Sequence, residues 1–319
     1  MPTGMNALAP RSAIVFAMAL LLLGGGCARL PSTGVTTLKP ASVRELRSYL
    51  LEHKADVDLF RLRGPFAVTR FKDLEIRVPG TEPVVADLYL SAPADKAPLV
   101  ILLHGYANSK DDHAYQAMHV ASWGMHSLAL QLPNQGPWID NGKTLALLVD
   151  LISRQPELID RRIDAGRIVL AGHSFGGAAV AVAMADGARA AGAVLLDPAG
   201  NDTELPGFLN QINKPVMLLG ADEQRSAAVN RDYFYRYIRA GIAEISIRDA
   251  VHEDAQYPAE LPLWWFTGES QATEALQITF VSALTAAAFS ISSTGKFDYA
   301  WTSFGDAIKN GRIFNAKKK

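Results

Sequence analysis

Short, continuously apolar runs recur along the middle of the chain and are separated by helical patterns. Leu99–Leu103 is apolar at every position (LVILL), as a strand buried on both faces requires. Alternating strands and helices predict an α/β fold with a mostly parallel central sheet and helices on both faces. Further strand-like runs lie at Ser127–Leu132, Ile168–Ala171, Ala193–Leu196, Val216–Leu219 and Ala243–Ile247, and the helical patterns lie at about 112–123, 143–154, 176–190 and 226–240.

The ends of this pattern carry further expected elements. Ala41–Lys54 is expected to form a helix, and Leu74–Val78 with Val84–Leu90 an antiparallel hairpin that turns at Pro79-Gly80. A last helix is expected at about 276–290, and Lys317–Lys319 is expected to be a solvated tail. No linker-like stretch divides residues 41–319, so we expect one domain there.

Composition excludes several classes of protein. Of the 319 residues, 49% are apolar and 20% charged, which fits a folded chain with a large core. Lys and Arg number 31 against 32 Asp and Glu, so no cationic field favours a nucleic-acid partner. A single Cys excludes an intramolecular disulfide framework, a Cys-rich zinc site and an iron–sulfur cluster.

The N-terminus has the pattern of an export signal. Arg11 precedes an apolar run, Ala13–Leu23, that is too short to span a bilayer but has the length of a signal-peptide core. Gly24-Gly25-Gly26-Cys27 follows and resembles the lipobox of bacterial lipoproteins, although Gly24 stands where that motif usually has a larger apolar residue. The resemblance predicts a signal peptide (1–26), a lipidated Cys27 with a tether (27–40), and an exported, membrane-anchored protein. The alternative is a plain secretory signal and a soluble periplasmic or secreted protein.

Gly172-His-Ser174-Phe-Gly176 is the most specific motif, because it follows a buried strand and opens a helix. A nucleophile elbow needs this arrangement: the sharp turn exposes the serine hydroxyl, and almost no side chain fits two residues to either side. Ser174 is therefore the candidate nucleophile. No Lys follows the glycines, which argues against a phosphate-binding loop.

A serine nucleophile needs a base and a carboxylate that orients the base. Of the histidines, only His252 follows Ser174 in sequence, in a loop after a predicted strand. The predicted acid is Asp197, at the end of one apolar strand, with Glu223 or Asp222 after the next strand as alternatives. The oxyanion hole is predicted from the backbone N–H of Phe175, after the nucleophile, and of Tyr106, after Leu99–Leu103.

Several motifs occur in one order: His104-Gly105-Tyr106, Gly172-His-Ser174-Phe-Gly-Gly177, Leu196-Asp197-Pro198 and Val251-His252. This set, over about residues 85–255, resembles the platelet-activating-factor acetylhydrolase, chlorophyllase and dienelactone-hydrolase-like branch of the α/β-hydrolases. The resemblance implies an α/β-hydrolase fold and favours Asp197 as the acid.

The resulting hypothesis is a serine carboxylic-ester hydrolase that acts through an acyl-enzyme on a small or lipid-like ester. It needs no metal and no organic cofactor. The alternatives are a thioesterase, peptidase or acyltransferase on the same fold, or a non-catalytic binding protein of the cell envelope. Oligomeric state, acyl length and leaving group have no signature in the sequence.

Overall fold

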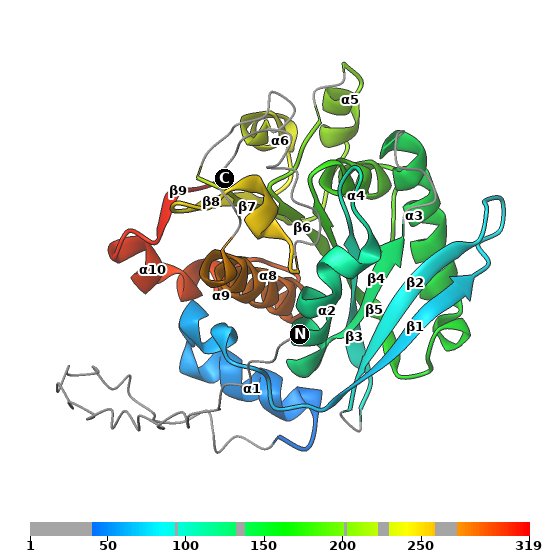
Figure 1. Cartoon of the computed structure of the whole chain (residues 1–319), viewed down its shortest axis with the longest axis horizontal. Helices are drawn as coiled ribbons and strands as arrows, with labels where there is room; N and C mark the ends of the chain where they lie inside the picture. The colour runs from blue at the N-terminus through cyan, green and yellow to red at the C-terminus, as the bar shows by residue number, and fades with distance from the viewer. Residues whose placement is uncertain (1–39, 93–94, 132–137, 201–202, 223–229, 259–272) are drawn as a thin grey trace, which may run out of the picture. The chain divides into compact units, whose positions relative to one another are not determined.

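The predicted apolar runs form strands of one sheet (Figure 1). The structure is a computed structural model that describes residues 40–92, 95–131, 138–200, 203–222, 230–258 and 273–319. The strands of this part lie in the order β1-β2-β4-β3-β5-β6-β7-β8-β9. Their bounds are β1 Val68–Ile76, β2 Val84–Ser91, β3 Ala97–Leu103, β4 His126–Gln131, β5 Ile163–His173, β6 Gly192–Leu196, β7 Val216–Gly220, β8 Ile242–Ile247 and β9 Ile313–Lys318.

The sheet is parallel in its middle and antiparallel at both edges. Strands β3 to β8 pair in parallel with one another. The predicted hairpin forms β1 and β2, and β2 pairs antiparallel to β4. The prediction of a mostly parallel α/β sheet is therefore confirmed.

Helices cover both faces of the sheet (Figure 1). Helices α3 and α4 pack against each other, and α4 also packs on β5. On the opposite face, α8 packs against β5 and β6, and α2 against β4. The helices are α1 Val43–His53, α2 Ala114–Ser122, α3 Trp138–Arg154, α4 Phe175–Ala185, α5 Leu205–Leu209, α6 Arg231–Tyr237, α8 Glu274–Thr294, α9 Asp298–Ser303 and α10 Gly305–Lys309, with 3₁₀ turns η1 Val57–Arg61, η2 Lys110–His113, η3 Pro156–Leu158 and η4 His252–Ala255.

The apolar runs lack alternation because each strand is buried on both faces. In β3, Leu99, Ile101 and Leu103 enter the core on the α3–α4 side. Val100 and Leu102 enter the core on the α8 side. Successive side chains of a strand point to opposite faces, so a central strand must be apolar at every position to supply both cores.

The C-terminal part differs from one expectation. The predicted last helix is α8, whose ends lie beyond 276–290 on both sides. By length and composition alone it could cross a membrane, but most of its residues are buried within the fold. The predicted solvated tail is wrong: Lys317 and Lys318 belong to β9, which pairs antiparallel with β8. Lys317 also forms ion pairs with Asp232 and Glu244, so partner charges explain why a basic segment is ordered.

Residues 38–319 group as one compact unit. The predicted signal peptide and most of the predicted tether, Cys27 included, lie outside the described residues.

Candidate functional site

A sharp turn joins β5 to α4 and contains Ser174 alone between the two elements. Ser174 has φ 54° and ψ −128°, a conformation that is strained for any residue with a side chain. The flanking glycines make the turn possible. A Cβ on Gly172 would lie 2.3 Å from the Gly176 carbonyl oxygen, and one on Gly176 would lie 2.4 Å from that of His104. The sequence folds here as a nucleophile elbow requires.

The loop after β3 passes directly against Ser174. A Cβ on Gly105 would lie 2.8 Å from the Ser174 Cβ and 3.4 Å from its Oγ. This contact brings the backbone around Tyr106 to the serine. Phe175 is the first residue of α4, so its N–H has no acceptor within the helix. These are the two predicted donors to an oxyanion, and both belong to backbone close to Ser174.

Asp197 and His252 meet although they are far apart in the sequence. Asp197 follows β6 and is fully buried, whereas His252 begins η4 and its side chain is 22% exposed. The His252 Nδ1 lies 2.6 Å from the Asp197 Oδ2. An ionised carboxylate only accepts hydrogen bonds, so Nδ1 carries the proton and Nε2 keeps its lone pair. This is the tautomer that a general base for serine needs.

Backbone contacts join this pair to the elbow. The Ser174 N–H donates to the Leu196 carbonyl at 3.1 Å, and the Ala199 N–H donates to the Ser174 carbonyl at 3.0 Å. Asp197 lies between these two partners in the chain. On the other side, the His173 Nε2 donates to the His252 carbonyl at 3.1 Å. The elbow is thus fixed to the segments that carry the predicted acid and base.

The environment keeps Asp197 ionised. Burial alone would raise its pKa, but the hydrogen bond and charge of His252, the charge of Arg231 and the N–H of Ala221 together lower it. Arg231 Nη1 lies 2.8 Å from the Asp197 Oδ1, and the Ala221 N–H lies 3.1 Å from the same oxygen. One carboxylate oxygen thus contacts the imidazole, and the other contacts the cation and the amide.

His173, the residue before the nucleophile, packs between two other histidines. The ring of His173 lies 4.4 Å from that of His252 and 6.2 Å from that of His113, measured between centroids. Burial, followed by the charge of His252, lowers the pKa of His173 well below its ordinary value. Burial also lowers the pKa of His113 to about 4. His173 and His113 are therefore neutral near pH 7.

The alternative acids have other positions. The Asp222 Oδ2 accepts from the Asp249 N–H at 2.8 Å, which uses that carboxylate to fix the loop before His252. Glu223 lies outside the described residues. Within the part of the chain that the structure describes, no group of three or more His, Cys, Asp or Glu side chains could hold a metal ion.

Arg231 is a charged neighbour of the site that sequence reasoning missed. It is the first residue of α6 and is 4% exposed. A lone Arg at a helix start usually lies in solvent, so nothing in its local sequence marks it as buried. Gly220 is the one partial signal: a Cβ there would lie 2.0 Å from the Arg231 Nη1, so the guanidinium occupies the space that a side chain would fill.

Comparison with curated proteins gives no significant match. Comparison with family models gives a match to the alpha/beta hydrolase family over residues 100–295. That match covers most of the chain and includes the end of β3, the elbow, the ends of β6 and β7, and η4. Together with the parallel sheet and the strained turn at Ser174, it shows that the chain belongs to the alpha/beta hydrolase family.

Proposed function

We propose that this α/β-hydrolase is a serine carboxylic-ester hydrolase, with Ser174 as nucleophile, His252 as base and Asp197 as the orienting acid. The observation that carries the proposal is the 2.6 Å hydrogen bond between His252 and the buried Asp197, next to the strained turn that bears Ser174. A buried carboxylate that fixes an imidazole tautomer beside a serine elbow suits acyl transfer.

The reaction follows from these positions. Ser174 Oγ attacks the ester carbonyl carbon while His252 Nε2 takes the hydroxyl proton. The N–H groups of Tyr106 and Phe175 donate to the oxyanion, and each such donor is typically worth about 3 kcal/mol of barrier. The alcohol leaves with the proton from His252. Water then attacks the acyl-enzyme with His252 as base, and the carboxylic acid leaves as Ser174 regains its proton.

The test is hydrolysis of p-nitrophenyl esters, from acetate to palmitate, combined with fluorophosphonate labelling. Ser174→Ala and Asp197→Asn should each lower kcat/KM by about 10³-fold or more. Asp222→Asn is the matched control, because that carboxylate binds a backbone N–H instead of the base, and Glu223→Gln tests the other alternative. A protein that is inert towards every ester and towards the fluorophosphonate would contradict the proposal and favour a binding role.

Matched ester, thioester and amide substrates then separate an esterase from a thioesterase or peptidase on the same fold. Added alcohols test for acyltransferase activity, because acyl transfer to an alcohol would give a new ester instead of the acid.

We also propose that the protein is exported and anchored in a membrane through a lipidated Cys27. The apolar run Ala13–Leu23 and the small residues before Cys27 support this proposal. Mass spectrometry of the mature N-terminus should find a diacylglyceryl-modified Cys27. A Cys27→Ser variant should move to the soluble fraction, and an unmodified, soluble wild-type protein would contradict the anchor.

A further inference from the structure

Asp197 is paired with a second charged residue on the side away from His252. The Arg231 Nη1 lies 2.8 Å from the Asp197 Oδ1, and the same guanidinium donates to the Ala221 carbonyl. The two side chains are 4% and 0% exposed. A buried charge is costly unless it is paired, so removing either side chain would leave the other buried without this ion pair.

The pairing extends outward from the site through two more charges. Arg231 Nε lies 3.7 Å from the Glu244 Oε1, on β8. The Glu244 Oε2 lies 3.1 Å from the Lys317 Nζ, on β9. A row of alternating charges thus runs from the acid of the site to the edge strand of the sheet. Burial raises the pKa of Glu244, although Lys317 and Arg231 partly offset this effect.

We propose that Arg231 is a positioning residue for the hydrolase reaction: it fixes the Asp197 carboxylate and limits the negative field that His252 experiences. This inference rests on the proposed function. A carboxylate alone stabilises the imidazolium and so keeps a base protonated to higher pH. A guanidinium on the far oxygen opposes that effect, so His252 stays neutral, and able to act as a base, to lower pH.

Other charged or titratable groups near the pair do not replace Arg231. His173 faces His252 from β5 and is neutral, and His113 lies behind it with a pKa of about 4. Asp222 contacts the loop before His252. Among the described residues, the other charged groups on neighbouring elements include Glu253 and Asp254 on η4, Asp232 on α6, Glu244 on β8 and Lys317 on β9. Of these, Lys317 is the only cation, and Glu244 lies between it and Arg231.

The test compares kcat/KM against pH for the wild type, Arg231→Met and Arg231→Lys. Arg231→Met should lower kcat/KM by about tenfold to a hundredfold, the range typical for loss of a group that orients a contacting residue. It should also move the acidic limb of the profile to higher pH. Arg231→Lys keeps the charge and should restore the position of the limb. Arg236→Met is the control, because Arg236 is an exposed residue of the same helix.

A second variant tests the inference independently, in case Arg231→Met does not fold. Gly220→Ala keeps every charge but displaces the guanidinium from its position, so it should shift the limb in the same direction. If the wild type is active and the acidic limb of the pH profile is unchanged in both Arg231→Met and Gly220→Ala, the inference about Arg231 fails and the proposed function stands. A wild type that neither hydrolyses esters nor reacts with a fluorophosphonate overturns the proposed function instead.

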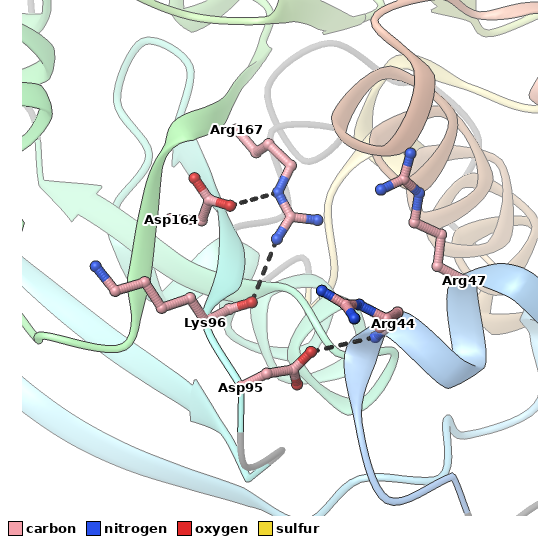
Figure 2. Close-up of a pocket in the computed structure, with 6 residues that line it drawn as sticks. All are labelled: Arg44, Arg47, Asp95, Lys96, Asp164 and Arg167. Carbon is pink, nitrogen blue, oxygen red and sulfur yellow. Dashed lines mark hydrogen bonds and ion pairs between the residues drawn. The ribbon is translucent and has the colours of Figure 1, made fainter.

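A different observation concerns the other end of the sheet. A pocket of about 390 Å³ is lined by six residues, of which four are cationic: Arg44, Arg47, Lys96 and Arg167. Figure 2 draws these residues. Ser174 lies seven positions after Arg167 (174 − 167), just past the end of β5, which places the pocket roughly 23 Å from the elbow at about 3.3 Å per residue. The pocket is therefore separate from the hydrolase site.

The two carboxylates of this pocket are already engaged. Asp95 accepts from the N–H groups of Val43 and Arg44, at the start of α1. Asp164 accepts from the Arg167 Nε at 2.7 Å. Four cations against two carboxylates leave an excess of two positive charges. Within the described ranges, the structure gives no ion pair to the side chains of Arg44 and Lys96.

We propose that this pocket binds the phosphate group of an anionic ligand. The guanidinium groups of Arg44 and Arg167 belong to residues that line the same pocket, and planar guanidinium groups match the geometry of phosphate oxygens. The third guanidinium, that of Arg47, donates to the Ser293 carbonyl. A phospholipid headgroup is one source, because α1 follows directly after the segment that is predicted to connect the fold to Cys27. A soluble phosphate ester is the other source.

The test uses residues 28–319, which contain the compact unit 38–319. Vesicles of phosphatidylcholine with and without phosphatidylglycerol form one arm, and titration with inorganic phosphate forms the other. An Arg44→Gln, Lys96→Gln double variant should weaken binding about thirtyfold, as expected for two cations near an anionic surface. If the wild type binds in one arm and the double variant does not, the result supports the site. The arm in which this happens shows whether the ligand is a phospholipid headgroup or a soluble phosphate. Absence of binding in both arms, or equal loss in an exposed Lys72→Gln, Arg236→Gln control, overturns it.

Discussion

Gly105 offers a sharp test of how the β3 loop positions the nucleophile. In Gly105→Ala, the new Cβ would lie 2.8 Å from the Ser174 Cβ, whereas ordinary contacts begin near 3.4 Å. The loop or the elbow must therefore move by about 0.6 Å (3.4 − 2.8). Backbone hydrogen bonds to Leu196 and Ala199 hold the elbow in place. We therefore expect the β3 loop to shift, which moves the oxyanion donors away from the position relative to Ser174 Oγ that the reaction needs.

The size of the effect follows from two estimates. Overpacking of this kind typically costs about 1–3 kcal/mol, which lowers the melting temperature by about 2–10 °C in a domain of this size. A misplacement of about 1 Å can cost a reaction about 10²-fold, so a shift of about 0.6 Å should lower kcat/KM roughly tenfold or more. We therefore expect a loss of activity that is large for a small change in stability.

The assay measures p-nitrophenyl ester hydrolysis, the rate of fluorophosphonate labelling and the melting temperature of the same preparations. Gly207→Ala is the matched control. Gly207 lies in α5, and its added Cβ meets no atom within 4 Å, so activity should be unchanged and stability slightly higher. Wild-type activity in Gly105→Ala, or an equal loss in Gly207→Ala, would refute the reasoning.

Three further predictions concern stability. Ser174→Gly should melt above Ser174→Ala, because the conformation of residue 174 costs a residue with a side chain about 1–3 kcal/mol; calorimetry of both variants that gives equal melting temperatures would argue against strain. Burial lowers the pKa of His113, His119 and His126 to about 4, so the unfolded chain binds more protons between about pH 6.5 and 4. Urea unfolding should show stability falling as pH falls through that window, by up to about 1.4 kcal/mol per pH unit for each histidine, and equal stability at pH 5 and 7 would contradict this. Burial raises the pKa of Asp254 to about 6, so this group makes the folded protein more stable as pH falls from about 6 to 4. Asp254→Asn removes that contribution and should lose stability more steeply on acidification than the wild type. Parallel stability curves for the two proteins would contradict the prediction.

The sequence predicts the strands well where burial on both faces forces unbroken apolar runs, as in β3, β6 and β7. It predicts less where tertiary partners decide. β5 begins at Ile163, earlier than its apolar run at Ile168–Ala171. The apolar run starts later because residues 164–167 are only partly buried or exposed and can therefore be polar. β9 carries lysines and has no strand-like pattern, and it is ordered by pairing with β8 and by the carboxylates of Asp232 and Glu244.

The same division applies to the candidate site. Ser174 and its glycines can be predicted because the elbow imposes a local steric requirement that only those residue types meet. His252 can be predicted by elimination along the chain. The choice among Asp197, Asp222 and Glu223 cannot be made from the residues alone, because it depends on which strand end meets the loop of His252. Arg231 could not be predicted, since its role depends on a partner brought to it by the fold.

Strain and buried charge in this protein concentrate at the carboxyl edge of the central strands. Ser174 and Asp197 both have positive φ, at 54° and 40°, and each directly follows a strand whose last residues are buried. The rigid double-sided core holds these residues in conformations that they would not adopt alone. Asp197 can be fully buried and still ionised only because its two oxygens contact different partners, His252 on one and Arg231 with the Ala221 N–H on the other. Removal of Arg231 should therefore change the contact between Asp197 and His252. The pH dependence of the reaction is then a more sensitive probe of this arrangement than the rate at neutral pH.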